Sequence, residues 1–122
     1  MGMIQKGNCI CFIKNGDGAA GYAVYKDESF IATSDILVAY ANWINKYTGL
    51  FFVVAQDKIK QKYSHGYKRN QRHLLADKIM LPADSKGAPD FEYMEQYTKN
   101  LMYKKYSQYL NYIKSLPYGD EI

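Results

Sequence analysis

Hydrophobic residues in the first forty positions form short runs that are typical of strands. An apolar run over residues 9–14 is followed by the turn-forming residues 15–18, so the pattern predicts a β-hairpin whose second strand covers residues 22–25. Two further short apolar runs, residues 30–32 and 36–40, predict one or two more strands, with Ser34 and Asp35 marking a bend or bulge if there are two. This half of the chain is therefore predicted to form a small β-meander.

From residue 42 the spacing of the apolar residues changes to three and four. The residues with this spacing are Trp43, Ile44, Tyr47, Leu50, Phe51, Val54 and Ile59. The spacing predicts an amphipathic helix over residues 43–61, slightly weakened by Gly49. The apolar run 78–81, which Pro82 stops, predicts a short buried strand.

A longer helix is predicted over residues 91–115. Asp90 has the side chain of an N-cap, and acids in the first turns with lysines later in the helix suit the helix dipole. Its apolar residues follow a loose spacing of three and four. A helix of this length extends about 37 Å, which is longer than one domain of this size can cover. We therefore expect part of it to seek a partner helix.

Together these elements predict an α+β fold in one domain. The chain has 122 residues, of which 48% are hydrophobic and 16% aromatic, enough for a packed core and too many for a disordered chain. We expect a small, twisted, mostly antiparallel sheet, with the helix of residues 43–61 packed on it and the later helix projecting away. The predicted strand regions are 9–14, 22–25, 36–40 and 78–81. The predicted parts are an α+β domain over 1–89, a helix over 90–116 and a tail over 117–122.

The sequence also indicates where the protein resides. The longest apolar run, residues 49–55, is far shorter than the roughly 20 residues that span a bilayer. The N-terminus lacks the apolar core of a secretory signal, so we expect a cytoplasmic protein without a membrane helix. Cys9 and Cys11 lie on one strand, too close along the chain for an easy disulfide, and we expect buried, reduced thiols.

No catalytic pattern stands out. Cys9 or Cys11 would need a histidine beside it, but nothing in the sequence orients His65 or His73 toward an apolar strand. The His and Cys spacings match no zinc pattern, and residues 15–21 lack the Lys-Ser end of a phosphate loop. We therefore expect no enzymatic activity, no metal and no cofactor.

Positive charge is concentrated in residues 58–72, which contain no acid although the net charge is only +4. Composition alone leaves open whether this segment is a solvated surface or touches nucleic acid. In the second case the phosphate contacts would be Lys62, Lys68, Arg69 and Arg72. Base edges would be read by Tyr63, Ser64, His65, Tyr67 and Asn70. Lys14, Asn15 and Asp17 on the hairpin turn would join them, although a plain surface turn explains these three equally well.

Several short motifs occur in a defined order: the hairpin "GDGAAGYAVY", the strand "FIAT", the loop "YSHGYK", the strand "KIMLP" and the helix start "PDFEYMEQY". Each motif is weak alone, but the ordered set is fairly specific. Over residues 4–116 the chain resembles the target recognition domain of type I restriction-modification specificity subunits and their type IIB and IIG relatives. It resembles a single, N-terminally shortened copy, whereas the family normally carries two.

The resemblance implies a non-catalytic module that reads double-stranded DNA. Such a module positions a DNA methyltransferase subunit, and in complete systems a restriction subunit, on a defined sequence. It also implies that helix 90–116 is half of a spacer coiled coil, which packs against a second helix. The apolar seam of this helix, which a single domain cannot bury, separately predicts that two chains associate through it. An interaction protein that binds a methyltransferase or restriction complex through this helix without reading DNA remains the alternative. A small hydrolase is disfavoured by the missing catalytic pattern.

Overall fold

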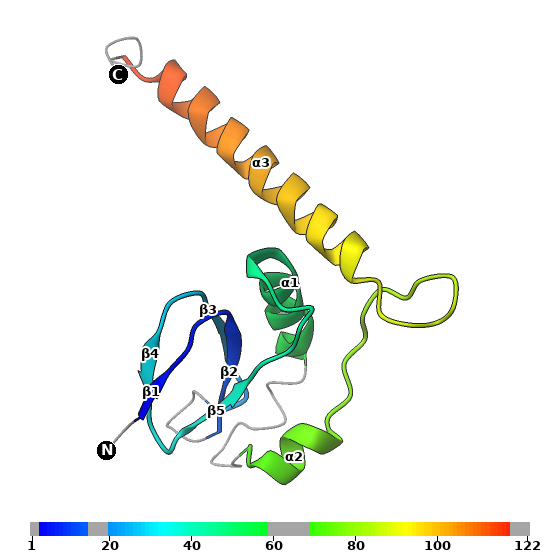
Figure 1. Ribbon diagram of the computed structural model, residues 1–122. Coiled ribbons are helices and arrows are strands. Elements are labelled where there is room, and N and C mark those ends of the chain that lie inside the picture. Colours follow the sequence, from blue (N-terminus) through cyan, green and yellow to red (C-terminus); the bar gives the residue numbers. More distant parts are fainter. Residues whose placement is uncertain (1–2, 15–19, 59–68, 118–122) are drawn as a thin grey trace.

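The structure is a computed structural model that describes residues 3–14, 20–58 and 69–117 (Figure 1). Its strands are β1 Met3–Gln5, β2 Cys9–Ile13, β3 Ala23–Lys26, β4 Phe30–Ala32 and β5 Ile36–Ala39. Its helices are α1 Lys46–Gln56, α2 Gln71–Ala76 and α3 Phe91–Ser115. The predicted α+β class is confirmed, as are a small antiparallel sheet and a long C-terminal helix. None of the helices in these ranges is both long and apolar enough to cross a membrane.

The main sheet has three antiparallel strands in the order β3-β2-β5. Cys11 of β2 lies opposite Val24 on one side and opposite Val38 on the other. Because β2 is central, its first four residues are buried. Side chains alternate between the two faces of a strand, so Ile10 and Phe12 enter the main core while Cys9 and Cys11 face the other way. β1 and β4 form a separate two-stranded antiparallel sheet that the sequence only half predicted, since β1 was missed.

Helix α1 covers the core face of the sheet, but it begins at Lys46 and not at residue 43 as predicted. Asn45 caps the helix, because its side chain accepts from the N–H groups of Tyr47 and Thr48 while the Thr48 hydroxyl accepts from the Asn45 N–H. Trp43 and Ile44 precede the helix and still pack into the core. After Gln56 a single tight turn covers residues 57–58, and residues 59–61 lie outside the described ranges.

Gly49 has a packing role that helix propensity does not reveal. It is buried in α1, and a Cβ atom placed there would lie 2.5 Å from a ring carbon of Tyr25 on β3. The ring is held at its far end, where the Tyr25 hydroxyl donates to Asn8 at 2.6 Å. The glycine therefore lets α1 approach the sheet closely.

The predicted strand at residues 78–81 is wrong. This segment pairs with no strand among the described residues, and Met80 is 91% exposed. A strand needs a partner edge as well as apolar residues, and here the run simply connects α2 to a turn closed by the bridge between Ala83 and Pro89. The short helix α2, which precedes this run, was not predicted.

Helix α3 begins as expected, with the Asp90 side chain accepting from the Tyr93 N–H. Its first turns pack on α1 and on the residues before it. The Trp43 and Phe91 rings stack at 4.6 Å, Asn45 donates to Glu95 at 2.7 Å, and Met94 is fully buried. The C-terminal half of the helix extends away from the rest of the fold (Figure 1), which agrees with the prediction that it projects.

Candidate nucleic-acid interface

Arg69 occupies the interior of the protein and has no exposed surface. Its Nη2 and Nε atoms both lie 3.1 Å from one carboxylate oxygen of Asp77, which is itself almost fully buried. Its Nη1 donates to the side-chain oxygen of Gln56 at 2.7 Å and to the carbonyl of Gly21 at 3.4 Å. The guanidinium carbon also lies 4.9 Å from the centre of the Phe12 ring. These groups are called the Arg69 cluster below.

The Arg69 backbone extends this cluster to the hairpin. Its N–H donates to the carbonyl of Lys14 at 2.9 Å, and the Lys14 N–H donates to Asp35 at 3.0 Å. Arg69 therefore contacts the positions on both sides of the hairpin turn, Lys14 before it and Gly21 after it. It also contacts Gln56, the last residue of α1.

The burial of Arg69 corrects the surface position that the charge pattern predicted for it. The Arg69 guanidinium points into the interior, where it binds a carboxylate, an amide oxygen and a carbonyl. One signal in the sequence was available, because Asp77 is the first acid after the acid-free run that contains Arg69. Nothing in a linear pattern, however, showed that the two side chains would turn inward together.

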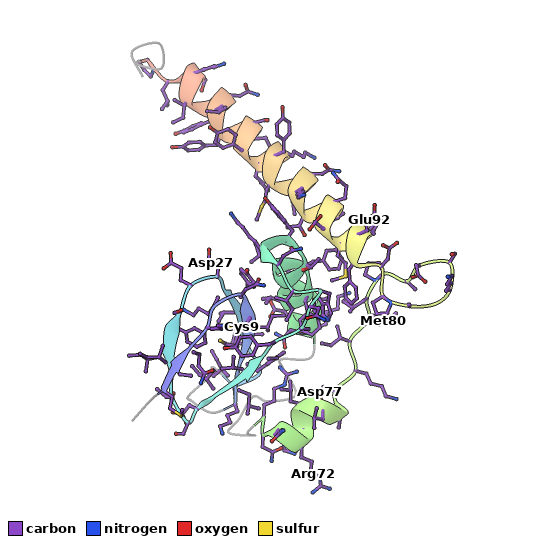
Figure 2. All side chains as sticks on the ribbon, in the orientation of Figure 1. Cys9, Asp27, Arg72, Asp77, Met80 and Glu92 are labelled. Atoms are coloured by element: carbon purple, nitrogen blue, oxygen red, sulfur yellow. The ribbon has the colours of Figure 1, made fainter. Side chains whose placement is uncertain are left out.

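Three further candidates lie within the described residues. Asn70 is exposed and its side chain accepts from the His73 N–H, so it caps α2. Arg72 is exposed on α2 and extends away from the rest of the fold (Figure 2). Lys14 is partly buried at the end of β2. Lys14 and α2 are thus brought to the same end of the sheet by the backbone contact between Lys14 and Arg69.

The remaining candidates lie outside the described residues. They are Asn15, Asp17, Lys62, Tyr63, Ser64, His65, Tyr67 and Lys68. The described residues that border these two segments are Lys14, Ala20, Lys58 and Arg69, and Lys14 and Arg69 are joined by the backbone hydrogen bond described above. One end of each segment therefore lies at the Arg69 cluster.

The two cysteines are buried and free, as predicted. Burial, followed by the neighbouring Cys9 thiol, raises the pKa of Cys11 to about 12. A thiol with this pKa stays protonated near neutral pH and is a poor nucleophile. Among the residues that the structure describes, no three His, Cys, Asp or Glu side chains gather as metal ligands would.

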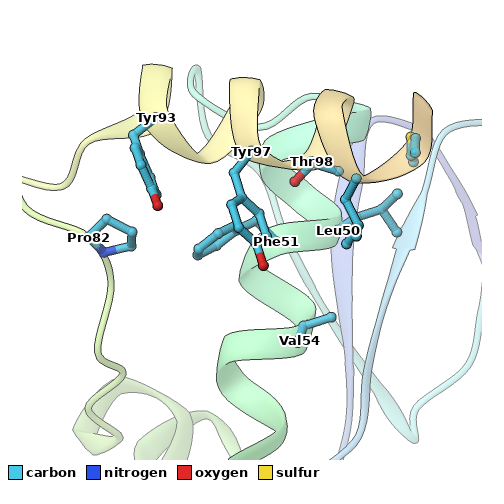
Figure 3. A pocket seen from close by; sticks show the side chains of 9 residues that line it. Leu50, Phe51, Val54, Pro82, Tyr93, Tyr97 and Thr98 are labelled. Carbon is cyan, nitrogen blue, oxygen red and sulfur yellow. The ribbon is translucent and has the colours of Figure 1, made fainter. Parts of the chain in front are cut away.

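A second surface feature lies between α1 and α3 (Figure 3). It is an apolar groove of about 510 Å³, lined in part by Leu50, Phe51, Val54, Tyr97 and Leu101. Val54 is 69% exposed and Leu101 44% exposed, so the groove leaves large apolar side chains in contact with solvent. By helical spacing, Tyr109 and Tyr112 lie on the same face further along α3, and both are exposed.

Comparison with known proteins gives two matches. Residues 2–111 match the family described as the type I restriction modification DNA specificity domain. A 53-residue stretch is 43% identical to the "Type II restriction enzyme BgcI specificity subunit S.BcgI" of Heyndrickxia coagulans. That stretch is 43% of this chain and 16% of the relative, so the match spans about a sixth of the relative's length. No solved structure matches the chain.

Proposed function

We propose the following function because this chain belongs to the family of type I restriction modification DNA specificity domains. The protein is a sequence-specific DNA-binding module of a restriction-modification system. It positions a methyltransferase subunit, and in complete systems a nuclease subunit, on double-stranded DNA in the cytoplasm. The module supplies recognition and leaves catalysis to its partners.

The single observation that carries this proposal is the family match over nearly the whole chain. The relative with 43% identity over 53 residues, which is described as a specificity subunit, supports the same function. The described part of the site is compatible with DNA, because α2 presents Arg72 to solvent beside Asn70. In the proposal Lys62, Lys68 and Arg72 contact phosphates, while Tyr63, Ser64, His65, Tyr67 and Asn70 read base edges, with Asn15 and Asp17 beside them.

A salt titration tests this function directly. Binding of the 122-residue chain to a random pool of labelled duplexes is measured by fluorescence anisotropy at several salt concentrations. The triple variant Lys62→Ala/Lys68→Ala/Arg72→Ala should bind more weakly, and each lost phosphate contact should lower the log–log salt slope by about 0.9.

The matched control is Lys26→Ala/Lys46→Ala/Lys86→Ala, which removes the same charge from exposed positions outside α2 and α3. It should leave the slope unchanged, since none of these lysines belongs to the proposed DNA contacts. Equal effects of the two triple variants would mean that only net charge matters. A wild-type chain that binds no duplex at low salt would contradict the DNA-binding function.

A second candidate function is favoured by the groove between α1 and α3. An apolar surface of this kind is unusual on a monomer and is typical of a protein-binding site. In this alternative the chain binds a methyltransferase or restriction complex through α3 without reading DNA. The salt titration separates the two candidates, because this one predicts no salt-dependent binding to duplex.

Under either function we propose that the exposed face of α3 pairs with another helix, that of a second copy of the chain or of a methyltransferase subunit. Glu92 and Glu95 lie in the first turns of α3, and Lys104 and Lys105 lie further along. Two copies that pair in antiparallel orientation would bring these opposite charges together. The division into a domain of residues 1–89 and a spacer helix of residues 90–116 belongs to this proposal.

A further inference from the structure

Arg69 and Asp77, which form an ion pair, lie at the two ends of α2. Arg69 immediately precedes Asn70, the N-cap of this helix, and Asp77 is its C-cap. None of the six residues of α2 is fully buried, and Leu74 reaches the main core only in part. The helix therefore has little core of its own, and its position depends mainly on the Arg69 cluster at its two ends.

The same cluster ties α2 to the rest of the domain. Arg69 reaches Gln56 at the end of α1, Gly21 two residues before β3, and the carbonyl of Lys14 just after β2. One side chain and its backbone N–H thus bring three separate parts of the fold to α2. A lysine has one compact ammonium group and could not reach the carboxylate, the amide and the carbonyl from the same geometry.

The buried ion pair fixes the direction of α2 more than it stabilises the fold. Arg69 and Gln56 have no exposed surface, and the Asp77 side chain is 3% exposed. Removing two charges from water offsets most of their attraction, so apolar residues of similar size often replace a buried ion pair without loss of stability. Apolar residues would fill the space, but they would not fix the direction in which α2 leaves the sheet.

We infer that the Arg69–Asp77 pair is a positioning element for DNA discrimination. It acts by fixing α2, with Arg72 and Asn70, relative to Lys14 at the end of the hairpin, and it does not touch DNA itself. This inference rests on the proposed DNA-binding function. It adds a set of buried residues on which sequence discrimination depends, distinct from the surface residues that supply affinity.

The test uses the double variant Arg69→Met/Asp77→Leu in the full chain. The wild type first enriches its preferred duplex from a random duplex library, and that duplex and the starting pool then serve as probes. The double variant should keep its circular dichroism spectrum and bind the random pool within about threefold of the wild type. Its preference for the enriched duplex over the pool should fall by about tenfold, as expected for loss of a well-aligned base contact.

Two further variants complete the test. Lys26→Met/Glu28→Leu removes an exposed lysine and an exposed acid at the end of the sheet away from Lys14, and it should discriminate like the wild type. Gln56→Leu removes the amide partner of Arg69 and leaves the ion pair. If the double variant does not fold, the preference of Gln56→Leu for the enriched duplex over the pool provides the test instead. A folded variant of the cluster with unchanged discrimination would overturn the inference while leaving the proposed function intact. Failure of the wild type to enrich any duplex would overturn both.

Discussion

Gly49 is the point of closest approach between α1 and the sheet. Replacing it with alanine should raise helix propensity by about 1 kcal/mol. The new methyl group, however, would lie 2.5 Å from the Tyr25 ring, which Asn8 holds at its hydroxyl. Overpacking of this kind costs about 1–3 kcal/mol, so we expect Gly49→Ala to lower the free energy of unfolding measured in urea.

The double variant Gly49→Ala/Tyr25→Leu separates these effects. If the ring causes the loss, the double variant should be more stable than the sum of the two single changes predicts. A Gly49→Ala protein that is more stable than the wild type would show that propensity outweighs packing at this position.

At the scale of elements, α3 consists of two parts with different surroundings. Met94 is fully buried against α1, whereas Tyr109, four turns later, is 59% exposed. Met94→Ala should therefore lower the free energy of unfolding by about 2–5 kcal/mol, and Tyr109→Ala should change it by less than about 0.5 kcal/mol. Urea denaturation of the two variants, followed by circular dichroism, measures both values. Equal losses would mean that the outer part of α3 is packed in solution.

The elements that the sequence predicted well are those that depend on local interactions. The bounds of α3 follow from the Asp90 cap and a long run of helical spacing. The start of α1 was predicted too early because Trp43 and Ile44 pack into the core from the segment before the helix. The helix begins only after its N-cap, Asn45. The segment 78–81 looked like a strand, but strand formation depends on a partner that no local pattern contains.

The candidate site shows the same limit. Residue type marked Arg69 as a phosphate contact, since arginines are usually exposed. Its burial depends on Gln56, Gly21 and Asp77, which only the folded chain brings together. Asn70 and Arg72 remain candidates from composition alone, and they lie at the N-cap and in the first turn of α2, an element that was not predicted.

At the scale of the whole molecule, the exposed face of α3 predicts self-association. Light scattering should show a concentration-dependent rise in mass at tens of micromolar, and Leu101→Glu/Tyr112→Glu should abolish it. These two residues lie on the face that continues the groove, and a charge buried in a helix pair is costly. A symmetric dimer of this kind would present two recognition modules to one DNA site.

Tyr103→Glu/Tyr106→Glu is the matched control, because both tyrosines are exposed and helical spacing places them largely away from Leu101. This variant should still associate. If the wild-type chain remains monomeric across the whole concentration range, the α3 surface binds a different partner, such as a methyltransferase subunit.

The contact between Gln56 and Arg69 has a consequence for how such domains diversify. Because the two side chains meet at 2.7 Å, the residues on either side of residues 57–68 are held close together. Closing a connection between fixed ends costs only about 0.6 kcal/mol more for each doubling of its length. The connection over residues 57–68 can therefore accept insertions, deletions and wholesale replacement at small thermodynamic cost. Under the proposed function, exchange of this segment between related chains would change the DNA preference and keep the same scaffold.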